Sequence, residues 1–395
     1  MLLQGATLAD GSQADVRVDG ELITAVASHL DPTPGERTLD LAGHVLLPAA
    51  AEPHAHLDKA LTADLVPNPS GDLLGAIMAW RAHRTSLTVD DVAQRAERAV
   101  RMLVANGVTA VRTHVDVAAD VGTLGVEALV KVREVVAHLI DIQIVALVSP
   151  PITGPDGDAN RRALDAAVVA GADVVGGAPH LEPDQRAAME HVLELAAAAG
   201  LPVDLHMDET LDPGVLHLPE LAALVATSGF PHHVTASHCC SLGMQPLAVQ
   251  VEVSKVVAAA GIAVVTLPQT NLFLQARGWT TAPPRGLTAI RPLLDAGVTV
   301  AAGADNVQDP FNLVGRADPL ETSALLVMAA HLSPSESYEA VSSGSRAAMG
   351  LAPVAVAAGS PAELVAVPNA GSLREAIATA CGGRVVIHRG EVVQP

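Results

Sequence analysis

Short apolar segments rich in β-branched residues alternate with helix-like patterns from about residue 45 to residue 306. This composition is typical of strands buried on both faces, and helices between such strands connect them in parallel. Eight β/α units in series predict a (β/α)8 TIM barrel, an α/β fold whose chemistry lies where the strands end. The strand candidates are His44–His56, Val108–Val117, Ile140–Ser149, Ala172–His180, Pro202–Asp208, His233–Cys239, Ile262–Pro268 and Val298–Asp305.

The two ends of the chain have a different pattern. Short strands separated by glycine turns are predicted near Ala14–Val18 and Leu22–Val26, and again near Glu363–Val367 and Gly383–Val393. Because the termini of a domain commonly lie near each other, both ends can contribute to one unit. We expect a small β-sandwich-like domain of residues 1–44 plus 354–395, beside a barrel of residues 45–353.

The charge balance excludes several classes of partner. The chain carries 23 Lys and Arg against 43 Asp and Glu, a net charge of −20. A surface this acidic repels phosphate backbones and anionic lipid head groups, so neither nucleic acid nor a membrane surface is an expected partner. Residues 256–276 are uncharged, but Gly261, Pro268 and three amide side chains favour a helix end followed by a buried strand over a membrane span.

Cysteine usage points to a reducing compartment. The three cysteines, Cys239, Cys240 and Cys381, form no disulfide framework for a chain of this size. The first residues lack a basic segment followed by an apolar one, so we expect no secretory signal. Both observations predict a cytoplasmic protein.

The first strand candidate ends in a pair of histidines, His54 and His56. Alternate residues of a strand point to the same side, so the two imidazoles converge on one point. A hydrogen-bonded histidine pair is the simpler explanation for H-x-H in general, but the end of a barrel strand is where metal sites occur.

Further polar residues follow other strand candidates. His206, Asp208 and Glu209 follow the fifth, His238 ends the sixth and Asp305 ends the eighth. Each alone fits a turn or a structural hydrogen bond, whereas together they are costly to bury unless a cation compensates them. Neutral imidazoles with a carboxylate suit one divalent ion, Zn²⁺ or Fe²⁺.

The motifs EPHAHLDK, VRTHVDV, ADVVGGAPHLE, HMDE, VTASH, TNLFLQAR and GADNVQDPF occur in order between residues 52 and 311. With this arrangement the chain resembles the amidohydrolase superfamily, and within it the bacterial cytosine deaminase branch. The resemblance implies a metal-dependent hydrolase that deaminates an amino-substituted nitrogen heterocycle, a cyclic amidine, through a metal-bound hydroxide and releases ammonia.

The resemblance also implies roles for single residues. His54, His56, His206 and Asp305 would ligate one metal ion, and Asp305 would also accept the proton of the attacking water. Glu209 matches the proton-shuttling glutamate, and His238 matches a histidine beside the hydroxide that would stabilise the oxyanion. No bridging lysine follows the fourth strand candidate. Lys59, three residues past His56, is expected in a salt bridge at the barrel rim, while the role of His114 stays open.

The chain departs from the cytosine deaminases in its substrate residues. Ser149, followed by Pro150, stands where those enzymes carry a glutamine that reads the pyrimidine edge, Asn306 replaces an aspartate, and Phe311 replaces a tryptophan. These changes predict that the substrate is not cytosine and has an apolar or larger substituent near Ser149. Residues expected to contact the substrate are Leu73, Ser149, Gln275, Trp279, Asn306 and Phe311.

Two alternatives share the same sequence features. Related enzymes remove an alkylamine from a triazine or open a cyclic amide with the same metal site, and ammonia as the product separates deamination from both. The second alternative is a catalytically inactive barrel kept for binding, which has no need to retain a metal. The identity of the ring, the native metal and the oligomeric state, including a homo-oligomer, stay open at this level.

Overall fold

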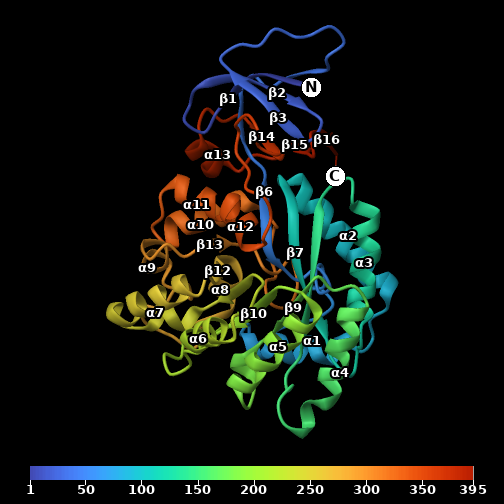
Figure 1. Cartoon of the computed structure of the whole chain (residues 1–395), viewed down its shortest axis with the longest axis vertical. Coiled ribbons are helices and arrows are strands. Elements are labelled where there is room, and N and C mark those ends of the chain that lie inside the picture. Colours follow the sequence, from blue (N-terminus) through green and yellow to red (C-terminus); the bar gives the residue numbers. More distant parts are fainter. Residues whose placement is uncertain (395) are drawn as a thin grey trace.

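The computed structural model describes residues 1–394, which form a barrel with a smaller sheet at one end (Figure 1). The barrel strands are hydrogen-bonded in the order in which they occur in the chain, and neighbours run parallel. Helices alternate with them along the sequence, so the predicted (β/α)8 barrel is confirmed. The strands are β6 (Ala50–Ala55), β7 (Val108–Val117), β8 (Asp141–Val148), β9 (Val174–Gly177), β10 (Val203–Met207), β11 (Val234–His238), β12 (Ala263–Thr266) and β13 (Val300–Ala302).

The barrel closes between its first strand and the residues that follow its last. The His56 amide donates to the Asp305 carbonyl (3.2 Å), and the Asp305 amide donates to the His54 carbonyl (3.1 Å). A parallel bridge pairs Ala55 with Asp305 at the same place. Closure therefore places residues from opposite ends of the barrel sequence side by side.

The helices surround the barrel and follow the cues in the sequence. In α2, the Thr88 side chain caps the N-terminus by accepting from the Asp91 amide, and Val92, Ala96 and Leu103 face the core. The helices are α1 (Leu73–Arg84), α2 (Val89–Ala105), α3 (Leu124–Val136), α4 (Asp158–Val169), α5 (Gln185–Ala199), α6 (Leu218–Ser228), α7 (Leu247–Ala259), α8 (Pro268–Leu274), α9 (Ile290–Asp295), α10 (Pro319–Ala329), α11 (Pro334–Val341) and α12 (Ser343–Ala348), with 3-10 turns η1 (Pro155–Gly157), η2 (Pro179–Leu181) and η3 (Cys240–Met244).

The uncharged stretch at residues 256–276 is divided among the end of α7, the strand β12 and the helix α8. This is the expected helix end followed by a buried strand. Within residues 1–394, we find no helix with both the length and the apolar character needed to cross a membrane.

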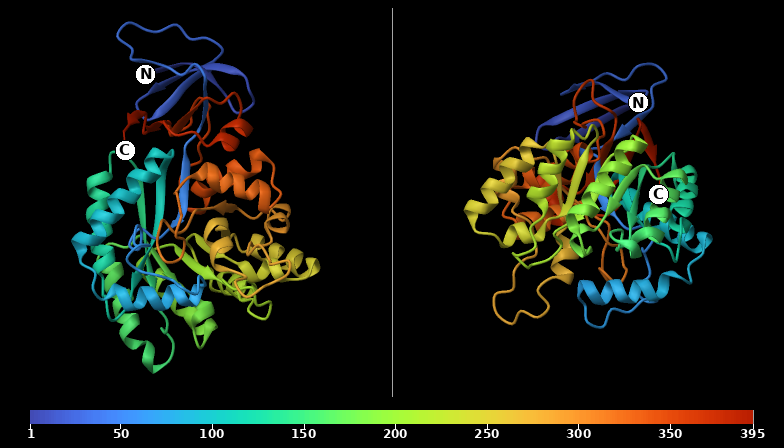
Figure 2. Two further views of the ribbon diagram at one scale, coloured as in Figure 1. Left: turned by 180° about the vertical axis from the view of Figure 1, so that it is seen from behind. Right: turned by 60° about the horizontal axis from the view of Figure 1, so that its bottom comes forward.

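Both ends of the chain form the smaller sheet, as Figures 1 and 2 show. Its order is β16-β15-β14-β5-β1-β2-β3, with β4 beside β1. Leu46 in β5 belongs to a separate small core within this sheet, whereas Val45 and Leu47 on either side of it pack into the main core. The elements are β1 (Leu2–Thr7), β2 (Gln13–Asp19), β3 (Leu22–Ala27), β4 (Thr38–Asp40), β5 (His44–Pro48), β14 (Leu364–Pro368), α13 (Leu373–Thr379), β15 (Val385–His388) and β16 (Glu391–Val393).

The structure differs from the sequence prediction in the first strand candidate, residues 44–56. Residues 44–48 pair antiparallel with β14, and only residues 50–55 pair with β7. Residues 45–48, predicted to belong to the barrel, therefore lie in the terminal sheet. The split follows from hydrogen bonding, since one extended segment changes partner at Ala49, whose amide donates to the Glu363 carbonyl (2.9 Å).

Candidate active site

Four polar side chains converge at the carboxyl end of the barrel. His54 and His56 lie at the end of β6, His206 lies in β10, and Asp305 follows β13. His56 Nε2 is 3.3 Å from His206 Nε2 and 3.3 Å from Asp305 Oδ1, and His54 Nε2 is 3.7 Å from the same oxygen. All four residues are buried.

The backbone has an unusual conformation where three of the strands end. Asp208, His238 and Asp305 adopt left-handed φ values of 48°, 70° and 65°. For residues other than glycine this conformation costs on the order of 1–3 kcal/mol each, and such residues cluster at functional sites. The packing of the surrounding barrel offsets the free-energy cost of these left-handed conformations.

The chemistry of the four-residue cluster fits a divalent cation. His54 Nε2 and Asp305 Oδ1 are buried without a hydrogen-bond partner in residues 1–394. Two ligands about 2.1 Å from a tetrahedral metal lie roughly 3.4 Å apart, close to the donor separations observed here. Burial lowers the pKa of His54, His56 and His206 well below the usual value, so their imidazoles are neutral and free to ligate. Burial, together with neighbouring carboxylates, raises the pKa of Asp305, and a cation would reverse that effect.

The Nδ1 atoms of His54 and His56 have contacts that orient the two rings. His56 Nδ1 lies 3.1 Å from the carbonyl oxygen of His114, and His54 Nδ1 lies 2.9 Å from Ser237 Oγ. The His114 ring stacks on the His54 ring, with centroids 3.8 Å apart. His114, whose role was open from the sequence, is thus buried behind His54 and does not line the cavity.

Glu209 and His238 stand beside this cluster. Glu209 Oε1 lies 3.6 Å from His238 Nδ1, which is also 3.2 Å from Asn271 Oδ1. Burial raises the pKa of Glu209 to about 8 and lowers the pKa of His238 to about 3. At neutral pH, Glu209 is therefore mainly protonated and His238 is neutral. Asn271 was not identified from the sequence, although it belongs to the motif TNLFLQAR.

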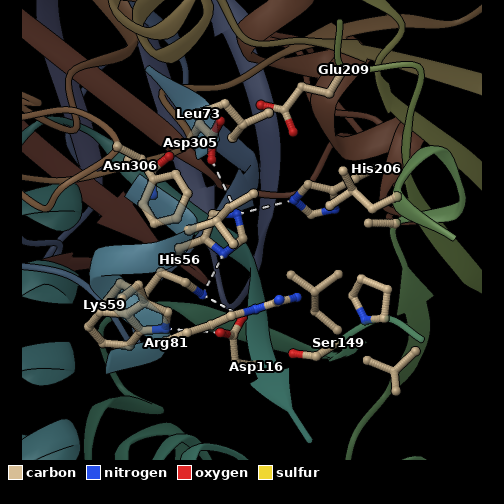
Figure 3. A pocket seen from close by; sticks show the side chains of 18 of the residues that line it. His56, Lys59, Leu73, Arg81, Asp116, Ser149, His206, Glu209, Asp305 and Asn306 are labelled. Carbon is tan, nitrogen blue, oxygen red and sulfur yellow. Dashed lines mark hydrogen bonds and ion pairs between the residues drawn. The ribbon is translucent and has the colours of Figure 1, made fainter. Parts of the chain in front are cut away.

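A cavity of about 100 Å³ opens above the cluster and is lined by His56, His206, Glu209, His238 and Asp305. Figure 3 shows Glu209, His206 and Asp305 on one side of the cavity and Lys59, Arg81 and Asp116 on the other. Four of the residues expected to contact the substrate line the same cavity: Leu73, Ser149, Asn306 and Phe311. Figure 3 labels Leu73, Ser149 and Asn306 around it.

Gln275 and Trp279, expected as walls of the same cavity, do not line it. They lie in an adjoining open groove, and Trp279 is 52% exposed. Helix α8 ends at Leu274, so the chain has already left the barrel mouth at these positions. Gln275 keeps an indirect link to the cavity, because its Nε2 donates to the Glu209 carbonyl at 3.4 Å.

Lys59 lies at the opposite end of the cavity from Glu209 (Figure 3). It forms the expected salt bridge, with Nζ at 2.7 Å from Asp116 Oδ1 and 3.2 Å from Asp58 Oδ2. Unlike an exposed rim residue, however, it is only 3% exposed, and its ammonium lies 5.5 Å from the centre of the Trp80 ring. Lys59 therefore forms part of the cavity wall.

Several wall residues were not identified from the sequence. Arg84 in α1 donates to Ser149 Oγ at 2.8 Å and pairs with Asp116 and Asp120, and Arg81 extends into the cavity (Figure 3). The wall beside Ser149 therefore combines charged side chains with apolar ones such as Val148 and Pro150, and the apolar or larger substituent expected near Ser149 stays a prediction. Asp116 could have been found, since it follows His114 by two residues on β7.

Comparisons with known proteins agree with this geometry. A model of the amidohydrolase family matches residues 82–394. The chain is 36% identical to a pterin deaminase from Rhizobium rhizogenes over 359 residues, which covers 90% of this chain and 82% of that protein.

Two solved structures are also similar. One is 5-methylcytosine deaminase from Klebsiella pneumoniae liganded with 5-fluorocytosine, with a TM-score of 0.90 and 30% identity over 100% of this chain and 97% of that chain. The other is N-isopropylammelide isopropylaminohydrolase from Burkholderia multivorans, with a TM-score of 0.86 and 28% identity over 99% of this chain and 97% of that chain.

Proposed function

The chain belongs to the amidohydrolase family, and from this premise we propose that it is a metal-dependent deaminase that hydrolyses an amino-substituted nitrogen heterocycle. The observation that carries the proposal is the cavity itself. Imidazole and carboxylate side chains of the kinds that ligate metal ions lie on one side of it, and Glu209, whose pKa burial raises to about 8, lies beside them. Hydrolytic deamination needs both an activated water and a proton donor for the ring.

We assign His54, His56, His206 and Asp305 as the ligands of one divalent ion, Zn²⁺ or Fe²⁺. The donor set and the separations of 3.3–3.7 Å support this assignment. When bound, such an ion lowers the pKa of water towards about 7 and stabilises negative charge that develops on oxygen.

Proton transfers are assigned to the two carboxyl groups of the cavity. Asp305 accepts a proton from the attacking water. Glu209, protonated at neutral pH, donates its proton to the ring nitrogen next to the attacked carbon. Asp305 then passes the proton that it took from water to the amino group, which leaves as ammonia as its C–N bond breaks. The new C–O bond becomes a carbonyl when its hydroxyl proton returns to Glu209, so both carboxyl groups end in their starting states.

His238 takes a different role from the one expected. If its Nδ1–H donates to Asn271 Oδ1, the neutral ring presents Nε2 to the cavity as an acceptor, and this nitrogen has no partner in residues 1–394. An acceptor orients the O–H of a water molecule and does not stabilise an oxyanion. We therefore assign His238 to holding the attacking water in position.

We propose a pterin as the first substrate to test. The relative that matches 90% of this chain is a pterin deaminase, whereas the glutamine of the cytosine deaminases is replaced by Ser149. The one amide side chain that lines the cavity, Asn306, is already hydrogen-bonded to Asp309 and Thr270, so a paired amide reader for a pyrimidine edge is absent from the described residues. Lys59, Arg81 and the Ser149 hydroxyl remain to recognise polar atoms of the ring.

Removal of an alkylamine is the second candidate function. It is supported by the similarity to N-isopropylammelide isopropylaminohydrolase, whose structure covers almost the whole chain. Incubation of the purified, metal-replete protein with pterin, cytosine, 5-methylcytosine and N-isopropylammelide separates the candidates, because ammonia and isopropylamine are assayed independently. Ammonia from pterin supports the proposal. Isopropylamine alone favours the second candidate. A protein that cannot be loaded with metal and that releases neither product favours an inactive barrel.

We also propose that the enzyme works in the cytoplasm. Cys239, Cys240 and Cys381 are all free thiols, as expected in a reducing compartment. Fractionation of cells that produce the protein tests this location.

A further inference from the structure

A row of buried polar side chains crosses the barrel interior behind His54. It begins at Arg112 in β7, continues through Asp204 in β10 and Ser237 in β11, and ends at His54 in β6. Each of the four residues is at most 1% exposed. We name this row the His54 relay.

The hydrogen bonds of the His54 relay have one consistent direction. Arg112 Nη1 donates to Asp204 Oδ2 at 2.9 Å, and Ser237 Oγ donates to Asp204 Oδ1 at 2.9 Å. A serine hydroxyl has a single proton, so once Ser237 gives it to the carboxylate, its oxygen can only accept. His54 Nδ1, 2.9 Å from Ser237 Oγ, must then carry the proton of the imidazole ring.

We propose that Ser237 and Asp204 are positioning residues that fix the tautomer of His54 and so present its Nε2 lone pair to the metal. The proposal rests on the metal site put forward under the proposed function. His54 Nε2 faces Asp305 across 3.7 Å and has no hydrogen-bond partner in the described chain, as a free ligand atom requires. Groups that hold the second ring nitrogen of a ligating histidine typically change metal affinity by about 10- to 100-fold.

The neighbouring histidines show why this position is informative. His56 Nδ1 faces a backbone carbonyl, that of His114, which no substitution removes. His206 Nδ1 has no hydrogen-bond partner in residues 1–394. At His56 the side chain of Lys59 adds a longer contact, with Nζ 3.4 Å from Nδ1. His54 is thus the imidazole whose second ring nitrogen is held by a side-chain hydroxyl alone, and this support can be deleted while every proposed ligand stays in place.

The simplest test is Ser237→Ala. Its dissociation constant for Zn²⁺, measured on metal-free protein by competition with a chromophoric chelator, should rise by about 10- to 100-fold. Ser254→Ala is the control, because Ser254 is also fully buried and its hydroxyl donates to the Gln250 carbonyl within α7, to no member of the relay. Its zinc affinity should equal that of the wild type.

A second pair of variants distinguishes the effect of the Ser237 hydroxyl from the effect of side-chain packing at this position. Ser237→Thr and Ser237→Val introduce nearly the same shape, but only threonine can accept from His54 and donate to Asp204. Threonine should bind zinc at least about tenfold more tightly than valine. Asp204→Asn combined with Ser237→Ala should lose no more affinity than the weaker-binding single variant, because both changes break one relay.

The relay would be overturned if Ser237→Ala bound zinc as tightly as the wild type, or if the threonine and valine variants bound it equally. The deaminase proposal would still stand in that case, provided that the wild type releases ammonia. A wild type that binds zinc no better than His206→Ala would remove the metal site itself and the relay with it. Melting temperatures of the metal-free proteins separate positioning from a general loss of stability. Positioning is supported if Ser237→Ala melts no lower than Ser254→Ala but binds zinc more weakly.

Discussion

Glu209 Oε1 and His238 Nδ1 lie 3.6 Å apart, and burial moves their pKa values in opposite directions, to about 8 and about 3. At neutral pH the carboxyl group therefore holds a proton that the adjacent imidazole does not take. Two neighbouring titratable groups whose pKa values are driven apart are typical of an acid and an acceptor in an active site.

Glu209→Gln removes the proton donor but keeps the shape of the side chain. We expect kcat to fall by roughly 10² or more while the metal content stays at the wild-type level. Steady-state kinetics with the best substrate, together with elemental analysis of the purified variant, measure both quantities. Loss of metal would mean that Glu209 is a ligand, and the assigned mechanism would then be wrong.

His206→Ala removes one proposed ligand. We expect it to lose both the metal and the deaminase activity, since three remaining donors hold a divalent ion poorly. His138→Ala, an exposed histidine just after α3, is the control and should keep both. An active His206→Ala enzyme with a full complement of metal contradicts the ligand assignment.

Cytosine should be a poor substrate. Ser149 can still donate its hydroxyl proton, but its oxygen already accepts from Arg84, and no amide side chain of the cavity is free to donate and accept together. The cytosine edge is therefore left partly unpaired, at about 1–3 kcal/mol per buried group. We expect kcat/KM for pterin to exceed that for cytosine by at least about 10²-fold. A value for cytosine above about 10⁵ M⁻¹s⁻¹ would contradict the specificity argument but not the fold.

Gly303 precedes the Asp305 segment and contacts a buried carboxylate. A Cβ at this position would lie 2.1 Å from Glu52 Oε1, and Glu52 holds the backbone amides of Ala304 (2.9 Å) and His54 (3.2 Å). We expect Gly303→Ala to lower the free energy of unfolding by about 1–3 kcal/mol and to weaken zinc binding. Gly382→Ala, where the added methyl group meets no atom within 4 Å, is the control for denaturant titrations.

Asp309 provides a pH-dependent test. Burial raises its pKa from 3.8 to about 6, so the folded state holds a proton that the unfolded state has released. Its contribution to stability is complete below about pH 4 and is lost as the pH rises to about 6, at up to 1.4 kcal/mol per pH unit.

Asp309→Asn cannot titrate at this position. In the presence of EDTA, the unfolding free energy of the wild type should therefore fall relative to that of the variant between about pH 4 and pH 6, and the difference should be constant at higher pH. A difference that stays level across this window, or that changes in the opposite direction, contradicts the raised pKa.

The order of the barrel strands and the proposed ligands could be predicted from the sequence because topology decides them. In a parallel barrel every strand ends at the same rim, so His54, His206 and Asp305 meet however the loops are folded. The split of residues 44–56 could not be predicted, since both halves are apolar and extended and differ only in the strand that they pair with.

The cavity wall was harder to predict because loops and helix α1 build it. Gln275 lies within the motif TNLFLQAR and Trp279 follows it, but the positions of both depend on where α8 ends. Arg84 reaches Ser149 from a helix that starts well beyond β6, and only its three-dimensional position shows that a guanidinium group forms part of this wall. Periodicity in a sequence carries no information on such contacts.

The antiparallel pairing of β5 with β14 has a consequence for synthesis of the protein. The chain runs from β5 directly into β6, which bears His54 and His56, yet at about 5–20 residues per second the ribosome makes β14 only tens of seconds after β5. Until then Val45 and Leu47 lack their neighbours from the end of the chain. A nascent chain interrupted before Leu364 therefore carries every proposed ligand but not the strand that anchors two of them, which ties enzymatic competence to completed translation.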